Sequence, residues 1–453
     1  MRILNGKEPK RLKLKKVAVE PEQWEVRVRG KRLVVDAHSL LAAEITGDSY
    51  PAPADSAYSF EPSGNAQTRS LVFNLTHDCN LRCTYCFVRN YNPDHEFPTL
   101  RMETIKQAIK LIPYNPHARF NPQFTINFFG GEPLLAWDRL KSAVAHAEMV
   151  AAQHGVKALF HVTTNGTLLT QEIVDFLDEH CFSLIVSLDG PAKVHDKYRP
   201  LPEGSSHAAT MAGLELLKGK KNIRGITLRS TFTGEGVDLV GRLEYLNDLC
   251  DKGYANSVSV EPASLTEQGC AALPDGHDQA ITLRNIKQFL PEYEKAADWF
   301  CARIKAGKRA RFFHFYKLMQ RIYDRQTSPS ECGAGMGYKT VGPTGDVFAC
   351  HREGGSRIGN IWTGIDEVKR AKWVDNRFYA RTKCPTCRVR FICGGGCRMC
   401  SMDMNGNTRD PDVLGCWFKK VWIKWCLWLL SEFNEDEVKL ALGRPSGKGC
   451  NCR

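Results

Sequence analysis

Long apolar runs are scarce in this chain of 453 residues. The richest one, at 417–433, is interrupted by Lys419, Lys420 and Lys424, whereas a bilayer-spanning helix needs about 20 consecutive apolar residues. We therefore expect a packed amphipathic helix there and no membrane segment. Residues 1–7 are not followed by the apolar stretch that a secretory signal peptide requires, so export is not expected either.

Motifs for nucleic-acid binding are also missing, although the formal net charge is +12. Such an excess is more often a solvated surface, and the same field would speed the approach of an acidic peptide. We expect no nucleic-acid partner. The 18 cysteines, in a chain without an export signal, favour metal binding over disulfides and a cytoplasmic location.

What the sequence does contain is an ordered series of cysteine motifs. Cys79, Cys83 and Cys86 are spaced C-x3-C-x2-C directly after the apolar run 71–75. Three thiolates on one short loop can hold three irons of a cubic 4Fe-4S cluster and leave the fourth iron open to a substrate. A zinc knuckle or three ordinary reduced thiols would give the same spacing, so the motif alone leaves these alternatives open.

A second motif follows another predicted strand. The apolar run 124–129 ends in the turn Gly130-Gly131-Glu132-Pro133. With both motifs, the chain resembles radical S-adenosylmethionine (radical SAM) enzymes. The resemblance implies that the three cysteines hold a catalytic cluster, whose open iron chelates the methionine amine and carboxylate of S-adenosylmethionine, and that the turn hydrogen-bonds the ammonium group. A sulfonium must lie against an electron donor, and its cationic amine needs acceptors.

Between residues 70 and 265, short apolar runs alternate with helix-like segments. The runs are 71–75, 124–129, 159–163, 182–188, 226–231 and 257–260, and the helical segments lie around 101–112, 137–154, 170–180, 207–219 and 237–252. Six β/α units indicate a parallel sheet and are too few for a complete eight-fold barrel. In barrels, chemistry lies at the C-terminal ends of the strands, where both motifs are placed.

Two further polar turns follow predicted strands, at 163–166 and 187–190. Each also suits an ordinary strand-to-helix turn. By resemblance to the peptide-modifying radical SAM enzymes, Ser187 and Arg199 would hold the cofactor carboxylate, since an Arg fork binds a carboxylate bidentately. The resemblance also implies cofactor contacts from Tyr85 and Asn165.

The C-terminal third carries seven more cysteines in an ordered pattern. Cys332 and Cys350 flank Gly345 as C-x12-G-x4-C, followed by C-x2-C-x5-C-x3-C at 384–397 and then by Cys416. The pattern resembles the SPASM extension of radical SAM enzymes, which implies two auxiliary 4Fe-4S clusters and three clusters in all. One would be held by Cys384, Cys387, Cys393 and Cys416, and the other by Cys332, Cys350 and Cys397.

The fourth ligand of that last cluster stays open. Cys400 is near in sequence, Cys270, Cys301, Cys450 and Cys452 are further candidates, and a substrate thiolate could equally take the position. Cys181, Cys250 and Cys426 lie in helix- or strand-like contexts and are expected to be buried small hydrophobic residues.

The resemblance implies an α/β fold: a partial (β/α)6 TIM-type barrel at 66–277 with a C-terminal iron-sulfur SPASM domain at 331–435. Helical periodicity at 278–308 predicts bridging helices within 278–330, and 436–453 is expected to be a flexible tail. Residues 1–65 form a basic lead. Within them, alternation across Gly30 predicts a β-hairpin at 24–35, 36–44 could begin a helix, and 50–65 reads as a linker. The hairpin could dock a peptide or only cover the barrel.

These features predict a radical SAM enzyme that abstracts hydrogen from a ribosomally made precursor peptide and installs a thioether between a Cys sulfur and a carbon. An external one-electron donor such as flavodoxin or ferredoxin would reduce the catalytic cluster. Segments 74–79, 164–169 and 346–351 are most similar to thioether-forming maturases. An acidic residue tends to follow the equivalent of Cys350 in anaerobic sulfatase-maturating enzymes, whereas this chain has His351. Formylglycine formation and carbon–carbon cross-linking are the alternative reactions, and a non-catalytic zinc or iron-sulfur adaptor is the alternative of another class.

Overall fold

The computed structural model describes residues 2–3, 23–37, 40, 42–45, 68–88, 98–114, 123–263, 279–374 and 377–444. The predicted linker at 50–65, residues 445–453 of the predicted tail, Cys270, Cys450 and Cys452 lie outside these residues. The expectation of a flexible tail is wrong for its first part, because helix α13 (Glu435–Ala441) buries Val438 and Ala441.

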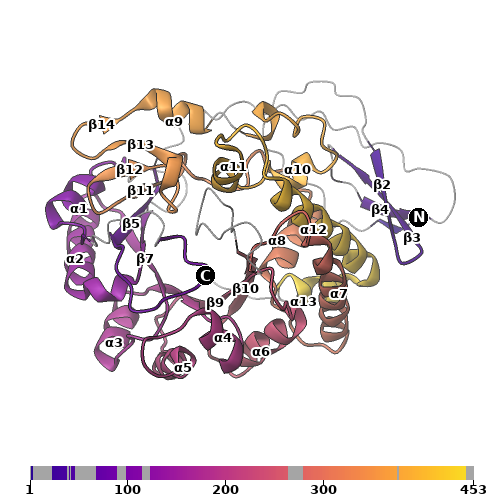
Figure 1. Cartoon of the computed structure of the whole chain (residues 1–453), viewed down its shortest axis with the longest axis horizontal. Helices are drawn as coiled ribbons and strands as arrows, with labels where there is room; N and C mark the ends of the chain where they lie inside the picture. Colours follow the sequence, from indigo (N-terminus) through magenta and orange to yellow (C-terminus); the bar gives the residue numbers. More distant parts are fainter. Residues whose placement is uncertain are drawn as a thin grey trace.

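A small antiparallel sheet occupies the N-terminal part (Figure 1). Its strands are β1 (Arg2–Ile3), β2 (Gln23–Val28), β3 (Lys31–Asp36) and β4 (Ala42–Ile45), in the order β1-β4-β3-β2. The β2–β3 pair confirms the predicted hairpin, with Gly30 at φ +76° in its turn. The helix expected at 36–44 is wrong, because β4 pairs with β3 and buries Ala42 and Ala43 completely.

The larger sheet begins with six parallel strands that lie side by side in chain order. They are β5 (Ser70–Thr76), β6 (Gln123–Gly130), β7 (Lys157–Thr164), β8 (Ser183–Ser187), β9 (Gly225–Phe232) and β10 (Ser257–Pro262). The connecting helices are η2 (Pro133–Ala136), α1 (Met102–Ile109), α2 (Trp137–Gln153), α3 (Gln171–Glu179), α4 (Ala192–Tyr198), α5 (Ser206–Leu217) and α6 (Leu239–Asp251). This arrangement confirms the partial barrel (Figure 1). Of these, the short turn η2 and helix α4 were not predicted, since four and seven residues are too few to show helical periodicity.

Along the barrel strands, buried residues that face the core alternate with half-buried residues that face the barrel interior. In β6, Phe124, Ile126 and Phe128 are buried, whereas the residues between them are half-buried. The ring of Phe128 lies 6.4 Å from that of Phe160 and 6.0 Å from that of Phe182. The half-buried positions of β7, β8 and β9 fall on the opposite face, because successive side chains of a strand point to opposite sides.

The C-terminal region continues the same sheet. β11 (Tyr338–Val341) pairs parallel with β5, and β12 (Asp346–Phe348), β13 (Arg357–Asn360) and β14 (Gly364–Ile365) follow in antiparallel pairs. The helices of this half are η3 (Ile286–Gln288), α7 (Phe289–Lys305), α8 (Phe313–Tyr323), η4 (Gly354–Ser356), α9 (Glu367–Val374), η5 (Phe378–Ala380), α10 (Arg390–Cys393), α11 (Arg398–Asn405), α12 (Val413–Glu432) and α13 (Glu435–Ala441).

Helices α7 and α8 lie in the segment where bridging helices were expected, and the apolar stretch at 417–433 falls within α12 except for its last residue. Helix α12 packs against α7 and α8 through aromatic side chains, with Phe418 5.5 Å from Phe289 between ring centres. Lys419 is buried but paired with Glu331 at 3.1 Å, whereas Lys420 and Lys424 are exposed.

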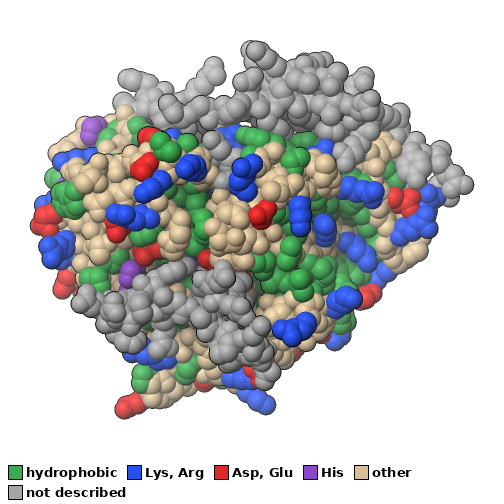
Figure 2. All heavy atoms as spheres, turned by 45° about the horizontal axis from the view of Figure 1, so that its top comes forward, with side chains coloured by type: hydrophobic (Ala, Val, Ile, Leu, Met, Phe, Trp, Pro, Cys, Tyr) green, Lys and Arg blue, Asp and Glu red, His purple; other side chains and the backbone are tan. Residues whose placement is uncertain are grey.

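Within the described part of the chain, no helix is both long and apolar enough to cross a membrane. Figure 2 shows Lys and Arg side chains scattered over one face of the molecule among apolar and neutral residues, and not gathered in one continuous patch.

The stacked aromatic core makes a stability prediction. Phe128→Ala should lower the free energy of unfolding by about 3–5 kcal/mol, because it removes a buried ring and leaves a cavity between Phe160 and Phe182. Phe313→Ala is the matched control, since Phe313 is 38% exposed and should change stability by less than about 1 kcal/mol. Urea denaturation followed by circular dichroism measures both, and equal losses would contradict the assignment of Phe128 to the core.

Candidate active site

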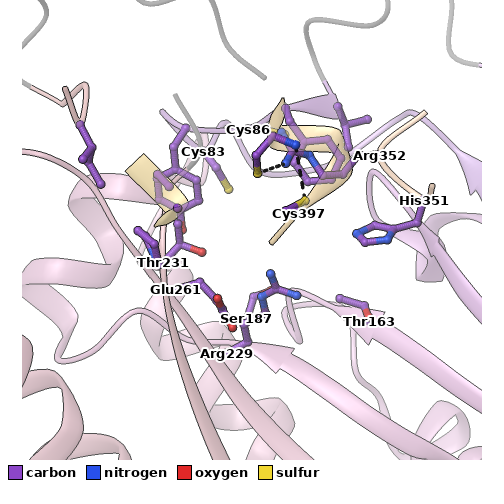
Figure 3. Close-up of a pocket in the computed structure, with 18 of the residues that line it drawn as sticks. Cys83, Cys86, Thr163, Ser187, Arg229, Thr231, Glu261, His351, Arg352 and Cys397 are labelled. Carbon is purple, nitrogen blue, oxygen red and sulfur yellow. Dashed lines mark hydrogen bonds between the residues drawn. The ribbon is translucent and has the colours of Figure 1, made fainter. Parts of the chain in front are cut away.

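A cavity of about 1030 Å³ lies at the C-terminal ends of the barrel strands (Figure 3). The strand residues that line it occupy the half-buried positions of the alternating pattern: Phe129 of β6, Thr163 of β7, Ser187 of β8, Arg229 and Thr231 of β9, and Glu261 of β10. The same space is lined by cysteines from both halves of the chain, namely Cys79, Cys83, Cys86, Cys393, Cys397, Cys400 and Cys416. The cavity therefore joins the barrel to the C-terminal region.

The loop with the first three cysteines follows β5 directly. Its backbone is tied to the end of α4, where Arg82 N–H donates to Pro200 O at 3.0 Å and Thr84 N–H donates to Tyr198 O at 2.9 Å. Cys86 N–H closes a turn onto Cys83 O at 3.3 Å. These bonds hold a short loop of thiols at the rim of the barrel.

Burial disfavours thiolates on this loop. It raises the pKa of Cys79 to about 12 and that of Cys83 to about 11. The three thiols also lie close enough for Cys83 and Cys86 to raise the pKa of Cys79. Because a bound metal stabilises thiolates, such a loop is suited to metal binding. In the part of the chain that the structure describes, no three Cys, His, Asp or Glu side chains are arranged to hold a single metal ion.

The Gly-Gly turn after β6 is docked on the cysteine loop through its backbone. Gly131 N–H donates to Thr76 O and Glu132 N–H to Asp78 O, both at 2.8 Å. A Cβ atom on Gly131 would lie 2.1 Å from Asp78 O, so a side chain has no room there. Gly130 has φ +131°, a conformation that favours glycine. The two glycines therefore set the distance between the loop and the turn.

Glu132 and Pro133, predicted to contact the cofactor, do not line the cavity. Glu132 is fully buried and accepts hydrogen bonds from Asn165 N–H at 2.7 Å, Thr164 Oγ1 at 2.8 Å and Leu134 N–H at 3.1 Å. Pro133 opens the helical turn η2. In this structure Glu132 connects the ends of β6 and β7, and the cavity-lining members of the turn are Gly130 and Gly131.

Asn165 lies next to the cysteine loop. Its Nδ2 donates to Asn80 Oδ1 at 2.8 Å and lies 3.9 Å from Cys79 Sγ. Asn165 and Ser187 both line the cavity, and their contacts with the cofactor stay predictions.

Arg199 and Tyr85 belong to a buried polar network around Asp189. Arg199 Nε lies 3.2 Å from Asp189 Oδ1, Tyr85 donates to Asp189 Oδ2, and the guanidinium lies over the Tyr85 ring. Burial alone would raise the pKa of Asp189, but the guanidiniums of Arg199 and Arg242 outweigh it and hold that pKa below its usual value. Arg199 Nη1 also lies 3.9 Å from Cys83 Sγ. The network places a cation beside the cysteine loop.

The C-terminal cysteines form the two groups that the sequence suggested. Cys332 and Cys350 both lie near enough to Cys397 to affect its pKa. In the second group, Cys416 is affected in the same way by Cys384, Cys387 and Cys393. Burial raises the pKa of Cys350 to about 11 and that of Cys416 to about 12. The structure thus brings each set together, and the ligand roles remain predictions.

Two more groups reach the set formed by Cys332, Cys350 and Cys397. The Tyr338 hydroxyl hydrogen-bonds to Cys350, and Cys400 hydrogen-bonds to Cys397. Arg352 Nη1 donates to Cys400 Sγ at 3.3 Å. Among the other candidates for a fourth ligand, Cys301 is buried in α7.

Of the three cysteines expected to be buried hydrophobic residues, Cys250 and Cys426 are buried. The expectation for Cys181 is wrong, because it is exposed in the turn after α3, with φ +52°.

Several cavity residues were not predicted. Arg229 and Glu261 come from the ends of β9 and β10, where the rule that chemistry follows the strands could have found them. His314 begins α8 and stacks on Trp422 of α12 at 3.8 Å between ring centres. Sequence spacing carries no signal for that contact, which joins elements about a hundred residues apart.

The residues present fit an iron-sulfur cluster with a nucleoside-bearing cofactor. The cavity offers three thiols on one loop, a neighbouring cation and two glycines that allow close approach. Thr84 Oγ1, a buried polar atom beside the loop, has no hydrogen-bond partner among the described residues. Such an atom indicates that a polar ligand belongs here.

The fold and site define the class as a partial-barrel enzyme with a three-thiol loop at the strand ends. Residues 73–249 match the model of the radical SAM superfamily. The chain is 25% identical to the radical SAM cyclopropyl synthase TigE of Paramaledivibacter caminithermalis, over 79% of this chain and 74% of the relative. It is 26% identical to a serine-type anaerobic sulfatase-maturating enzyme of Klebsiella aerogenes, over 77% and 84%.

Among solved structures, anSMEcpe with bound AdoMet matches with a TM-score of 0.63 at 19% identity, covering 83% of this chain and 98% of that one. The likeness confirms the fold. Residues 73–249 thus form a radical SAM domain, and members of that superfamily use S-adenosylmethionine and a 4Fe-4S cluster. The relatives named above include a cyclopropyl synthase and a sulfatase-maturating enzyme, and neither is named as thioether-forming.

Glu132 makes a pH prediction. Burial raises its pKa from 4.5 to about 7 despite its three hydrogen-bond donors. The folded chain then holds a proton that the unfolded chain loses, so the stabilisation is fully present below about pH 4.5 and is lost as the pH rises through 7. Relative to Glu132→Gln, the wild-type free energy of unfolding should fall by roughly 3 kcal/mol between pH 4 and 8. Urea denaturation without S-adenosylmethionine measures this, and parallel pH curves would contradict it.

Proposed function

We propose that this chain is a peptide-modifying radical SAM enzyme that forms a thioether cross-link in a ribosomally made precursor peptide. The observation that carries the proposal is the single cavity of about 1030 Å³, which is lined by thiols of the barrel loop and by thiols of the C-terminal region. A peptide side chain in that cavity can contact both sets. A protein that only carried metal would not need a shared cavity of this size.

Cys79, Cys83 and Cys86 would hold the catalytic cluster, with Gly130, Gly131, Asn165, Ser187 and Arg199 around the cofactor. When bound, the cluster and S-adenosylmethionine supply a 5′-deoxyadenosyl radical that abstracts hydrogen from a substrate carbon. Arg199, which lies beside Cys83 and is charged through its pairing with Asp189, would attract the cofactor carboxylate to the loop.

We propose two auxiliary clusters in the C-terminal region. Cys384, Cys387, Cys393 and Cys416 supply four thiols for one of them. For the other, Cys400 is the described thiol that contacts the set of three, through Cys397. We propose that the fourth ligand of this cluster is either Cys400 or a substrate thiolate that displaces Cys400. Arg352 would stabilise a thiolate in either case.

Other cavity residues exclude water and orient the substrate. Phe87, Phe129, Phe418 and Trp422 give the cavity apolar walls, which protect a reactive radical from side reactions. Burial, together with Arg229 and Arg352, lowers the pKa of His351 to about 3. Its ring is therefore neutral at physiological pH and can accept a hydrogen bond from a substrate thiol.

The reaction needs an external one-electron donor, and we propose a protein of the flavodoxin or ferredoxin class. The net charge of +12 suits the approach of an acidic partner. We also place the enzyme in the cytoplasm, where thiols stay reduced.

Formylglycine formation is the second candidate, because the Klebsiella aerogenes relative carries out sulfatase maturation by its name. The neutral His351 after Cys350 favours the thioether, since a sulfatase-type reaction is expected to use an acidic residue there. On a Cys substrate the two reactions differ in product mass, because formylglycine exchanges sulfur for oxygen whereas a thioether loses two hydrogen atoms. On a Ser substrate formylglycine also loses two hydrogen atoms, so there an aldehyde-reactive hydrazide probe and fragmentation of the peptide distinguish the products.

Cofactor cleavage tests the enzymatic assignment. Anaerobically reconstituted protein given dithionite and S-adenosylmethionine should release 5′-deoxyadenosine, and Cys83→Ala should reduce this release to background because it removes a cluster ligand. Cys250→Ala is the control, since Cys250 is a buried thiol away from the cavity. If wild-type protein with all its clusters loaded released no 5′-deoxyadenosine, the proposed enzymatic function would be wrong.

Joining a substrate carbon radical to a thiolate leaves one surplus electron, and we propose that the auxiliary clusters would accept it. This role predicts a different phenotype for Cys387→Ala. It should retain part of the 5′-deoxyadenosine release but lose cross-linked product, because the catalytic loop stays intact while electron acceptance is impaired. Mass spectrometry of a precursor peptide encoded beside this chain measures the product. A wild-type yield of cross-linked peptide from Cys387→Ala would contradict a role of the auxiliary cluster in the reaction.

A further inference from the structure

Arg229 is a cationic group in the cavity that none of the roles above uses. It projects from β9 toward the cavity centre, between Ser187 and His351 (Figure 3). Among the described residues, its guanidinium has neither a hydrogen bond nor an ion pair. It sits directly across from Ser187 in the β8–β9 register.

The carboxylate that acts on Arg229 is already held by other groups. Glu261 accepts a hydrogen bond from Ser259 Oγ at 2.6 Å and lies 2.9 Å from His314 Nε2. Arg229 interacts with Glu261 only through space. The five N–H donors of the guanidinium therefore remain available to a ligand.

A guanidinium without a hydrogen-bonded anion in a partly buried cavity loses favourable interactions with water, and an anion with two oxygens replaces them best. A carboxylate matches the planar fork of Arg and binds it bidentately. Arg199 differs from Arg229, because its guanidinium is already paired with the Asp189 carboxylate.

The anion could come from the cofactor or from the substrate. Arg199 lies 3.9 Å from Cys83 Sγ and is thus placed for the cofactor carboxylate. The groups that interact with Arg229 are Glu261 of β10 and His351 of the loop after β12, on the side of the C-terminal region. This placement favours the substrate.

We infer that Arg229 forms a subsite for a carboxylate of the peptide substrate, from an Asp or Glu side chain or the peptide C-terminus. The inference rests on the proposed peptide substrate. It makes Arg229 a residue that selects acidic peptides.

Peptide selection by the reconstituted protein tests the subsite. The probe is a mixed pool of nonapeptides with a central Cys, and the fraction retained by the protein is quantified by mass spectrometry. Wild-type protein should retain peptides with Asp or Glu about tenfold over their Asn or Gln counterparts. Arg229→Gln should abolish the preference, and Arg229→Lys should keep part of it, since it keeps the charge without the fork. Arg101→Gln, an exposed residue outside the cavity, is the control and should retain the wild-type preference.

The affinity for S-adenosylmethionine, measured by equilibrium dialysis, separates the two sources of the carboxylate. It should be unchanged in Arg229→Gln. A weakened cofactor affinity with the acidic preference intact would assign Arg229 to the cofactor and overturn the inference. Equal retention of acidic and amide peptides by wild-type protein would also overturn it. Failure of the proposed function shows separately, as absent 5′-deoxyadenosine release.

Discussion

The site depends on the close backbone contact between the Gly-Gly turn and the cysteine loop. Two hydrogen bonds of 2.8 Å join the turn to Thr76 O and Asp78 O. A Cβ at Gly131 would have to displace Asp78 O, which it would approach to 2.1 Å. Because the contact is made by backbone atoms, no side-chain rearrangement can relieve such a clash. The loop after β5 and the turn after β6 are therefore fixed relative to each other before any cofactor binds.

The same strand that carries the cysteine loop also positions the C-terminal region. β11 pairs with β5 along 338–341, so the sheet of the cysteine-rich half continues directly from the edge strand of the barrel. At the end of β5, Asn74 Nδ2 donates to Glu353 Oε1 at 2.6 Å and to His351 O at 3.1 Å, and His77 Nε2 lies 3.2 Å from Glu353 Oε1. Glu353 itself has φ +55°, which a non-glycine residue adopts only when its surroundings hold it. One strand thus orients both thiol-bearing regions toward a common cavity.

Much of the fold could be predicted because its signals are local. Strands β5 to β10 show as apolar runs, and the cysteine groups show as spacing. Residues fixed by tertiary contacts were harder to predict. β4 is a strand because β3 offers it a pairing edge, and Glu132 points away from the cavity because three donors from β7 and η2 surround its carboxylate. In the sequence, Arg229 resembles any polar residue of a half-buried strand. Only the structure shows that, among the described residues, its guanidinium has no hydrogen-bond partner.

The charges in the cavity link substrate binding to the strength of a base. Burial is the main reason that His351 has a pKa of about 3, and the guanidiniums of Arg229 and Arg352 lower that pKa further. A carboxylate bound to Arg229 would cancel much of the charge that this guanidinium presents to the imidazole. The pKa of His351 would then rise, and the ring would become a better acceptor when an acidic peptide fills the cavity. Glu261, which is held by Ser259 and His314, interacts with Arg229 only through space, so a bound carboxylate would add to the compensation that Glu261 supplies. With the proposed peptide bound, the arrangement would couple recognition at β9 to hydrogen-bond acceptance beside Cys350.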